Sequence, residues 1–570
     1  MTQQQFPPRR RHRRRGGVYW LIFTIALVIT CVIGYMKLVP SFEQQEVVYS
    51  HDHPIYYNGE LQQHGALVQD GHIKLPLPLL DELLEDSPIH YESETNTLVL
   101  TTLDKVLRFK TESLTALLNE KSYELNITAQ VENDTVYIPA ELIEQLYGLH
   151  IEQMDKVIAL YDGQFTIDTG SIIRKNGTAL RSEPTIKSAY YRELALGERL
   201  LVWETGEDWT KVQTESGTQG YVKSAHIQKG DAIVYSPSLE QYEGLKHDLS
   251  GKKINLTWEA IYNRQPTLST MPSMEGLNVV SPTWFELVDA EGTVQGKATH
   301  EYMEWANKRG YQVWALFSNG FEPDWTTAVL ASTEKRFAMI QQLVAFAELY
   351  QLDGINIDFE NVYTEDKENL VQFVKEMMPI MHEQGLVVSI DVTPKSNSEM
   401  WSVFLDRAAL GKLVDYMMVM AYDEHWASSP KAGSVASLPW VEQSIKRILE
   451  EDQVAPEKLI LGMPLYTRVW SEETLEDGST KVSSKAIGMT KAQEIITEHQ
   501  LTPELDEASG QHYIEYVEDG IKQRIWLEDE RSIAGRIDLV HKYKLAGVAT
   551  WARTFAKDDI WKVIDEELNQ

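Results

Sequence analysis

Short apolar runs, some of them alternating with polar residues, recur through residues 252–570, and longer runs with helical spacing separate most of them. The short runs are rich in Val, Ile and aromatic residues, which is typical of strands, and amphipathic stretches such as 332–351 are typical of helices. Strand–helix alternation with eight strands predicts a (β/α)8 (TIM) barrel, an α/β fold. The eight predicted strands lie within 254–259, 277–285, 311–319, 354–360, 386–394, 414–425, 458–470 and 531–551.

The stretch DGINIDFEN at 353–361 has one apolar and one polar face. In a barrel, the apolar face of a strand packs against the helices and the other face points toward the barrel axis. Inward carboxylates are costly unless they are paired or used, and active sites of this fold lie at the C-terminal ends of the strands. The stretch therefore marks the candidate active site. Its apolar positions are Ile355, Ile357 and Phe359, and its polar positions are Asn356, Asp358 and Glu360.

The N-terminal end combines a basic tail with an apolar run. Six Arg residues fall in the tail, 1–16, and the twenty residues of 17–36 carry no charge. A helix of that length spans about 30 Å, the thickness of a bilayer core. The positive-inside rule keeps the Arg cluster in the cytoplasm, and no A-x-A-like cleavage site follows. We therefore expect a transmembrane signal anchor, with 37–570 outside; a buried core helix is the alternative.

Two smaller domains are predicted between the anchor and the barrel. Residues 40–162 mix short strands and helices, including a hairpin at 95–110 and a strand–helix pair at 134–148 that ends at Gly148. The order of these elements resembles the small α+β N-terminal domain of copper amine oxidases. No metal-binding residues accompany the resemblance.

Residues 163–232 have short strands at roughly 8–12-residue spacing, which predicts a small β-barrel. The segment resembles the bacterial SH3-like domain, whose members often bind cell-wall material; a spacer that binds nothing is the alternative. A linker is predicted at 229–250. The matching residues are Leu180, Arg181, Gly197, Trp209, Val212, Gly220, Tyr221 and Val222.

The net charge limits the classes of binding partner that we expect, and the cysteine content limits the disulfides. The net charge of −32 disfavours nucleic acid. The single cysteine, Cys31, lies in the predicted anchor, so the exported part has no disulfide, and its large domains have enough core to fold without one. We expect no metal and no cofactor.

Asp358 and Glu360 lie two residues apart on one predicted strand, with Cα atoms about 6.6 Å apart. Glycosidases ordinarily hold two carboxylates on opposite sides of the scissile bond. Neighbours on one strand fit a different arrangement, in which one acid protonates the leaving oxygen and the nucleophile comes from elsewhere. The 2-acetamido oxygen of an N-acetylated sugar is one such nucleophile. A metal-dependent hydrolase with both acids as ligands is an alternative, but no His lies near them in the sequence.

The segment DGINIDFE resembles the DxxDxDxE motif of glycoside hydrolase family 18, the chitinase-like enzymes. MAYD at 420–423, at the end of the sixth predicted strand, resembles the family's M-x-Y-D. GVATW at 547–551 ends the eighth strand, where the family places a Trp under the reacting sugar. The resemblance covers about 252–570. With an SH3-like domain upstream, the chain is similar to the bacterial cell-wall and spore-associated branch of the family.

The resemblance implies a role for each matching residue. Glu360 is expected to be the general acid and then the base. Asp358 is expected to hold the acetamido N–H and stabilise the oxazolinium charge, and Tyr422 to hydrogen-bond the acetamido oxygen. The further candidates are Asp423, Trp551 and Trp470 for sugar binding, and Asp353 and Met420 as structural parts of the motifs.

Asn356 stands where the family pattern has an Asp that can share a proton with the central acid. Asn cannot share a proton, but it can hydrogen-bond to Asp358, and we group it with the substrate-binding residues. The cell-wall branch often has Asn here, so we expect an active site with a different pH profile.

The expected function is hydrolysis of β-1,4 bonds at N-acetylglucosamine, in peptidoglycan or in chitin-type oligomers. The resemblance implies a retaining, substrate-assisted mechanism through an oxazolinium ion. The expected location is the outer face of a bacterial cell membrane, most simply that of a Gram-positive cell. The alternative is a non-catalytic, lectin-like protein that binds cell-wall glycan with the same barrel.

Overall fold

A computed structural model of the chain describes residues 16–236 and 252–570. These residues form two compact units, one built from 16–82 and 129–236 and the other from 83–128 and 252–570. The Arg cluster of the predicted tail and most of the predicted linker at 229–250 lie outside the described residues.

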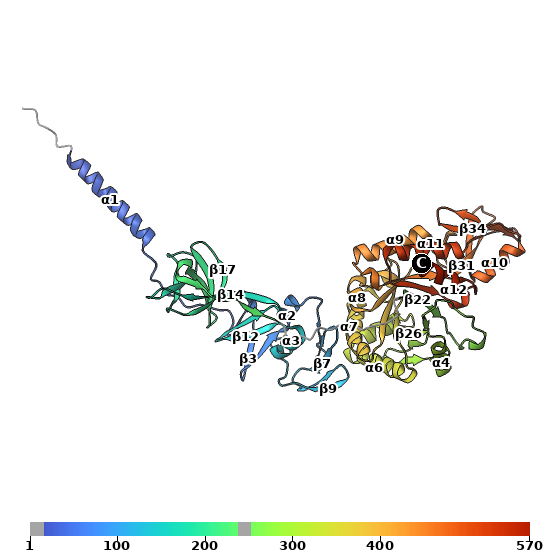
Figure 1. Cartoon of the computed structure of the whole chain (residues 1–570), viewed down its shortest axis with the longest axis horizontal. Coiled ribbons are helices and arrows are strands. Elements are labelled where there is room, and N and C mark those ends of the chain that lie inside the picture. Colours follow the sequence, from blue (N-terminus) through green and yellow to red (C-terminus); the bar gives the residue numbers. More distant parts are fainter. Residues whose placement is uncertain (1–15, 237–251) are drawn as a thin grey trace, which may run out of the picture. The chain divides into compact units, whose positions relative to one another are not determined.

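The second unit contains a closed barrel of eight parallel strands, so the predicted fold is confirmed (Figure 1). The strands follow the order β23-β22-β36-β30-β29-β28-β27-β26, and pairing of β23 with β26 closes the ring. They are β22 (Ile254–Glu259), β23 (Val279–Pro282), β26 (Gln312–Ser318), β27 (Gly354–Asp358), β28 (Val387–Val392), β29 (Tyr416–Met420), β30 (Leu459–Pro464) and β36 (Gly547–Trp551).

Helices surround the barrel, and local sequence signals start several of them. Ser332 caps one helix by accepting from the backbone N–H of Lys335, and Asp529 and Ser532 form a capping box at another. The helices are α4 (His300–Lys308), α5 (Pro323–Leu330), α6 (Thr333–Tyr350), α7 (Lys367–Glu383), α8 (Arg407–Leu413), α9 (Leu438–Glu451), α11 (Glu530–Tyr543) and α12 (Ile560–Leu568). Short helical turns η2 (Leu268–Thr270), η3 (Thr364–Asp366), η4 (Glu399–Val403), η5 (Pro456–Lys458) and η6 (Arg553–Phe555) lie between them.

The barrel has one apolar core outside the strands and another inside them. Ile355 and Ile357 of β27 belong to the outer cluster, which includes the helix residue Phe373. The inner cluster includes Trp258 and Trp314 from other strands. This separation confirms that the apolar face of 353–361 packs against the helices and its polar face points inward.

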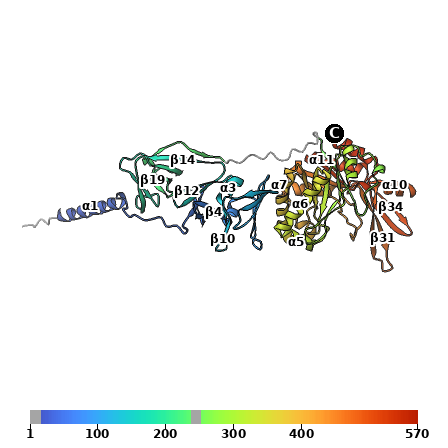
Figure 2. The same ribbon diagram turned by 90° about the horizontal axis from the view of Figure 1, so that it is seen from below.

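The predicted strand at 458–470 is wrong as a single element, because the structure divides it at Pro464. Pro has no backbone N–H to continue a ladder, and the N–H of Leu465 donates to the carbonyl of Trp551. The chain then leaves the barrel and enters a five-stranded antiparallel sheet beside α10 (Figure 2). That sheet contains β31 (Tyr466–Thr474), β32 (Thr480–Gly488), β33 (Glu504–Asp506), β34 (Gln511–Glu518) and β35 (Ile521–Trp526), with α10 at Met489–Glu498. A short hairpin, β24 (Phe285–Leu287) and β25 (Val294–Gly296), extends the barrel sheet.

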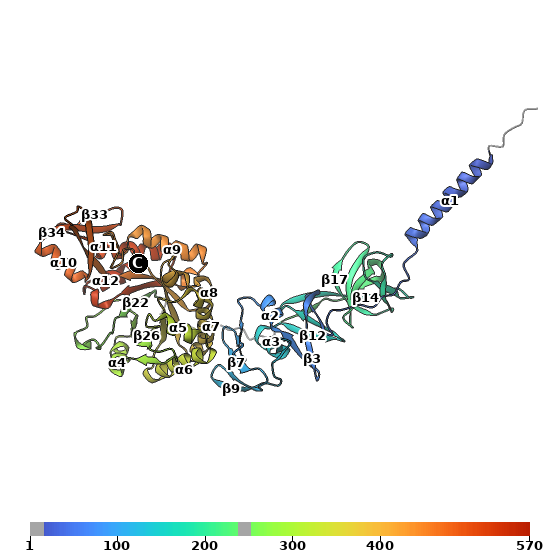
Figure 3. The same ribbon diagram turned by 180° about the vertical axis from the view of Figure 1, so that it is seen from behind.

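Residues 83–128 form a five-stranded antiparallel sheet that packs on the helical side of the barrel, next to α6 and α7 (Figures 1 and 3). Val99 and Val106 belong to the same apolar cluster as the barrel helices. Glu383 of α7 accepts from Asn119 over 2.6 Å and pairs with Lys121. This sheet, here called the docking sheet, contains β5 (Ile89–Glu92), β6 (Thr97–Thr101), β7 (Val106–Lys110), β8 (Thr115–Leu118) and β9 (Lys121–Glu124).

The first unit contains the rest of the predicted α+β domain as two four-stranded sheets. The predicted hairpin at 95–110 is present as β6 and β7, and the predicted helix ends at Gly148, whose φ of 71° needs no Cβ. The elements are β1 (Pro54–Tyr57), β2 (Glu60–Gly65), β3 (Leu67–Gln69), β4 (His72–Pro76), β10 (Gln130–Glu132), β11 (Thr135–Pro139), β12 (His150–Met154), β13 (Val157–Tyr161), α2 (Leu77–Leu83) and α3 (Ala140–Tyr147).

A further antiparallel sheet follows in the same unit, built around an apolar cluster that includes Leu180 and Val212. Residues 233–235, predicted as linker, form a strand that pairs with Phe165–Ile167, so this part of the linker prediction is wrong. The elements are β14 (Phe165–Ile172), β15 (Thr178–Arg181), β16 (Tyr190–Leu194), β17 (Arg199–Thr205), β18 (Trp209–Thr214), β19 (Gln219–Lys223), η1 (Ser224–His226), β20 (Ile227–Lys229) and β21 (Ile233–Tyr235).

The N-terminal helix α1 (Gly16–Leu38) makes an exposed apolar rod. Its segment Val18–Leu38 is long and apolar enough to cross a membrane. Length and composition alone support that capacity, and they fit a signal sequence as well as an anchor.

Candidate active site

The polar face of β27 places Asn356 inside the barrel, fully buried. Its Oδ1 accepts from the Trp258 indole N–H at 2.9 Å and from the Ser281 hydroxyl at 3.1 Å, and its Nδ2 donates to Oδ1 of Asp391 at 3.0 Å. The sequence suggested a hydrogen bond from Asn356 to Asp358. Within 16–236 and 252–570, the hydrogen bonds of this amide go instead to these three partners.

Asp358 and Glu360 follow at the carboxyl end of β27, and both side chains are half-buried. Oδ1 of Asp358 has no hydrogen-bond partner among the described protein groups. A buried acceptor without a partner costs about 1–3 kcal/mol, so this oxygen is suited to receive a donor from a bound molecule.

A buried amide fixes the backbone at Glu360. Asn319, just after β26, accepts from the Glu360 N–H at 3.1 Å and donates to the Glu360 carbonyl at 2.8 Å. Its Nδ2 also donates to the Thr326 hydroxyl at 3.0 Å, which fixes the amide itself. Asn319 therefore holds the peptide that carries Glu360, a role that the sequence analysis did not assign.

Burial and mutual repulsion shift the carboxyl groups toward their protonated forms. Burial raises the pKa of Asp358 above its usual range. Burial also raises the pKa of Glu360, and the negative charges of Asp358 and Asp423 add to the effect. Because these groups interact, their titration belongs to the group as a whole. A raised pKa keeps Glu360 protonated near neutral pH, the state in which it can donate a proton.

Tyr422 follows β29 and is half-buried beside these acids. Burial raises the pKa of its phenol far above the usual value, and the nearby charge of Asp391 adds to the shift. The hydroxyl therefore keeps its proton and can donate a hydrogen bond.

Asp423, one residue further on, is held by two side chains from the neighbouring chain segment. The Tyr466 hydroxyl donates to its Oδ1 at 2.6 Å, and the Arg468 guanidinium contacts the same oxygen at 3.1 Å. The Asp423 side chain is 43% exposed, so it is accessible from solvent. Tyr466 and Arg468 were missed in the sequence because they follow the break at Pro464.

Trp551 ends β36 and is half-buried at the same end of the barrel. Its ring lies 6.0 Å from that of Trp258 at an angle of 57°, and the Trp551–Ala552 peptide is cis. Arg553 then makes a two-pronged ion pair with buried Glu259 of β22, with its second contact at 2.9 Å. This pair ties the segment after Trp551 to the first barrel strand.

Of three other predicted residues, Trp470 is buried, and Asp353 and Met420 accept hydrogen bonds from backbone N–H groups. Trp470 is 1% exposed, and its indole N–H donates to the carbonyl of Gly433, so it offers no accessible stacking face and the proposed sugar contact is not favoured. Asp353 accepts from the Val313 N–H at 2.8 Å, and Met420 accepts from the Tyr422 N–H at 2.8 Å. The Met420 contact is made by its backbone carbonyl, and the structural roles of Asp353 and Met420 stay predictions.

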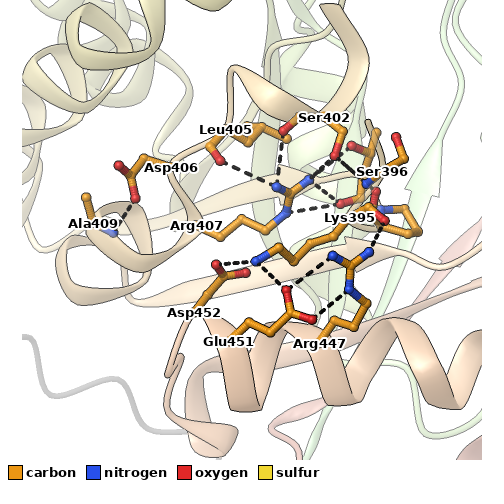
Figure 4. Close-up of polar contacts among 12 residues, drawn as sticks. Lys395, Ser396, Ser402, Leu405, Asp406, Arg407, Ala409, Arg447, Glu451 and Asp452 are labelled. Atoms are coloured by element: carbon orange, nitrogen blue, oxygen red, sulfur yellow. Dashed lines mark hydrogen bonds and ion pairs between the residues drawn. The ribbon is translucent and has the colours of Figure 1, made fainter. Parts of the chain in front are cut away.

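Asp391 of β28 is the buried acid that the sequence analysis missed. Its signal was present in 386–394, where Ser389 and Asp391 alternate with apolar residues as in β27. The loop after β28 is well held: Arg407 donates to the carbonyls of Thr393, Ser402 and Leu405, and Lys395 pairs with Glu451 and Asp452 (Figure 4).

The closed barrel and the acids at the end of β27 define a glycoside hydrolase-like domain. Residues 275–556 match the family model Glycosyl hydrolases family 18, and residues 57–160 match the Copper amine oxidase N-terminal domain. The chain therefore carries a family 18 glycoside hydrolase, preceded by a copper amine oxidase N-terminal domain.

Curated relatives agree with this family. The chain is 27% identical over 300 residues to the uncharacterized glycosylase YvbX of Bacillus subtilis (strain 168), an alignment that covers 50% of this chain and 84% of that protein. It is 25% identical over 255 residues to the cortical fragment-lytic enzyme of Bacillus anthracis, covering 44% of this chain and 57% of that protein. The chain thus spans little more than half the length of the latter relative.

Two solved structures share the fold. The Bacillus megaterium QM B1551 spore cortex-lytic enzyme SleL gives a TM-score of 0.50 at 20% identity, covering 60% of this chain and 77% of that one. The Bacillus cereus spore cortex-lytic enzyme SleL gives a TM-score of 0.50 at 18% identity, covering 66% of this chain and 89% of that one. At these identities the likeness concerns the fold.

Proposed function

We propose that the barrel hydrolyses β-1,4 bonds at N-acetylglucosamine in peptidoglycan by a retaining, substrate-assisted mechanism. The observation that carries the proposal is the arrangement at the end of β27, where Glu360 and Asp358 leave one strand side by side with Tyr422 nearby. Two such neighbours cannot take opposite sides of a glycosidic bond, so the acetamido oxygen of the substrate is the proposed nucleophile.

The chemistry of each group supports its proposed role. Glu360, protonated near neutral pH, donates to the leaving oxygen and then, as the carboxylate, takes a proton from the attacking water. The acetamido N–H supplies the donor that Oδ1 of Asp358 lacks. The Tyr422 hydroxyl donates to the acetamido oxygen and fixes its angle of attack. Asp423 and Trp551, both accessible to solvent, contact the sugars.

Peptidoglycan is the proposed substrate, and chitin-type oligomers are the second candidate. One relative is named a cortical fragment-lytic enzyme and one structural neighbour a spore cortex-lytic enzyme, and the proposed membrane position fits a wall polymer. Helix α1 acts in this proposal as an uncleaved signal anchor that leaves both units outside the cell.

The test incubates the full-length chain, in detergent, with peptidoglycan and with N-acetylglucosamine oligomers, and detects new reducing ends by mass spectrometry. The native protein should release fragments that end in N-acetylglucosamine. Glu360→Gln should lower the rate by about 100- to 10,000-fold, the usual contribution of a general acid. Glu365→Gln, an exposed change in the following turn η3, is the matched control and should retain cleavage.

The proposal is rejected if the native protein and Glu360→Gln both bind the cell wall and neither cleaves either glycan. The barrel would then act as a lectin.

A further inference from the structure

Strands β27 and β28 bring two carboxyl groups to neighbouring positions inside the barrel. Ile357 pairs with Ile390 in the parallel register, so Asp358 and Asp391 occupy the next positions on adjacent strands. Adjacent strands lie about 4.8 Å apart, and residues at matching positions point to the same face. Asp391 is 2% exposed.

Asn356 fixes the orientation of Asp391. The amide oxygen of Asn356 already accepts from Trp258 and Ser281, which determines which end of the side chain carries the NH2 group. That NH2 group donates to Oδ1 of Asp391. Oδ2 of Asp391 is therefore the oxygen left for a proton.

Among the described residues, the groups that act on Asp391 include no cation that would stabilise two negative charges. The charged groups that act on it are Asp358 and Glu360 from β27, and both repel a charge on Asp391, as burial does; the Asn356 amide and the Trp258 indole act in the opposite direction. Two arginines at this end of the barrel are already paired, Arg468 with Asp423 and Arg553 with Glu259, and the group that faces Asp391 from beyond β29 is the neutral Tyr422 phenol. Two ionised carboxylates side by side in this interior would carry a large energetic cost.

We propose that Asp358 and Asp391 hold one proton between them, and that Asp391 is a positioning residue that sets the charge of Asp358. This inference rests on the proposed function for its chemical consequence. The pair carries a single negative charge throughout. When substrate binds, the proton leaves the carboxyl of Asp358 for the carboxylate of Asp391, and the ionised Asp358 faces the acetamido group. No further reactant is needed, because one O–H bond breaks as the other forms.

The first test measures the number of protons that are released on unfolding, and it does not depend on catalysis. An unfolded Asp has a pKa of about 3.9, so at pH 6–7 unfolding releases the proton that the folded pair retains. The stability of the full-length chain in detergent, measured by denaturant titration across this range, gives the number of protons released. In Asp391→Asn and in Asp358→Asn the remaining carboxyl has no ionised partner beside it, so proton release on unfolding should end at a lower pH than in the native protein.

The double variant Asp358→Asn/Asp391→Asn should release one proton fewer than the native protein at pH 6, because only one proton is shared. Ser389→Ala, a buried change on the same face of β28, should leave the number unchanged. An unchanged pH range of proton release in Asp391→Asn would overturn the proposal, and so would release of two fewer protons by the double variant. Since both single variants carry the same prediction, the test does not depend on one of them folding.

The second test uses hydrolysis to separate positioning from packing. Asp391→Asn should lower kcat by at least tenfold with a smaller effect on KM, and should change the pH profile of kcat. Asn356→Asp/Asp391→Asn moves the carboxyl to the other inward neighbour of Asp358 and should recover much of the lost rate. A fall without recovery and with an unchanged pH profile would indicate packing alone. If the native protein cleaves nothing, the proposed function fails while the proton count still decides this inference.

Discussion

At the scale of residues, the barrel concentrates acids where their neutral forms are favoured. Asp358, Glu360 and Asp391 come from two adjacent strands, and burial raises the pKa of each. Asn319 holds the backbone of Glu360 from both sides. The site therefore combines a hydrogen-bonded backbone at Glu360 with neighbouring acids whose pKa values are raised by burial.

The pH dependence of hydrolysis should report this coupling. Glu360 works as the acid only while protonated, so activity should persist well above the ordinary glutamate pKa of about 4.3 and fall on the alkaline side. The charge of Asp423 raises the pKa of Glu360. Asp423→Asn removes that charge, so the pKa of Glu360 should fall and the alkaline limb of kcat/KM should move to lower pH.

Glu399→Gln removes an exposed carboxylate from the loop after β28 and serves as the control for this experiment. Its alkaline limb should coincide with that of the native protein. If the alkaline limb of the kcat/KM profile is unchanged in Asp423→Asn, or moves to higher pH, the electrostatic account is contradicted.

The site residues that could be predicted from the sequence were those that share one strand or a short motif. Alternation alone placed Asp358 and Glu360 inward, and the family resemblance added Tyr422 and Trp551. Asp391 and Asn319 were missed because their contacts cross between strands, and register is a property of the folded sheet. Trp470 was favoured by its place near a predicted strand end, but that strand had already left the barrel.

At the scale of elements, the barrel strands approach one another closely at glycines. A Cβ on Gly547, at the start of β36, would lie 2.0 Å from the carbonyl oxygen of Ile254 in β22. The eight elements themselves were predictable, since strands buried on both faces give continuous apolar runs. The split at Pro464 was not recognised, because the residues on both sides of it have strand-like composition.

Gly547→Ala should therefore destabilise the protein by about 1–3 kcal/mol or more, because the overlap is with backbone that cannot rotate away. Urea unfolding measures the change. Gly535→Ala in α11 is the matched control: the nearest atom to its Cβ is 3.6 Å away, and Ala is the better helix former, so this variant should be as stable as the native protein or more stable. Equal stability of both variants would show that β22 and β36 can separate without cost.

At the scale of the whole molecule, the docking sheet joins a segment near the N-terminus to the catalytic barrel. The sequence did not indicate this, because an alternating strand shows that it has an apolar face but not which surface covers that face. The contacts are specific: Arg108 lies 4.8 Å above the ring of Phe337, and the Thr333 N–H donates to Glu92 at 3.1 Å. The catalytic unit thus includes residues distant from the barrel in sequence.

A charge placed beneath the docking sheet should weaken the barrel unit. Val99→Asp buries an unpaired carboxyl in the cluster shared with the barrel helices and should cost on the order of 3 kcal/mol. Leu103→Asp, at a turn of the same sheet where the side chain is 61% exposed, should have little effect. Thermal unfolding compares the two, and an unaltered midpoint in Val99→Asp would mean that the sheet and the barrel unfold independently.

The docking sheet also changes what a single cut in the chain can do. The polypeptide passes from the first unit to the second, returns, and passes across again before the barrel begins. A protease that cleaves once between 236 and 252 severs the direct connection, yet the barrel remains bound to 83–128, which is continuous with α1. The barrel unit would stay joined to α1 through 83–128 after such a nick, so separating it from α1 requires a second break.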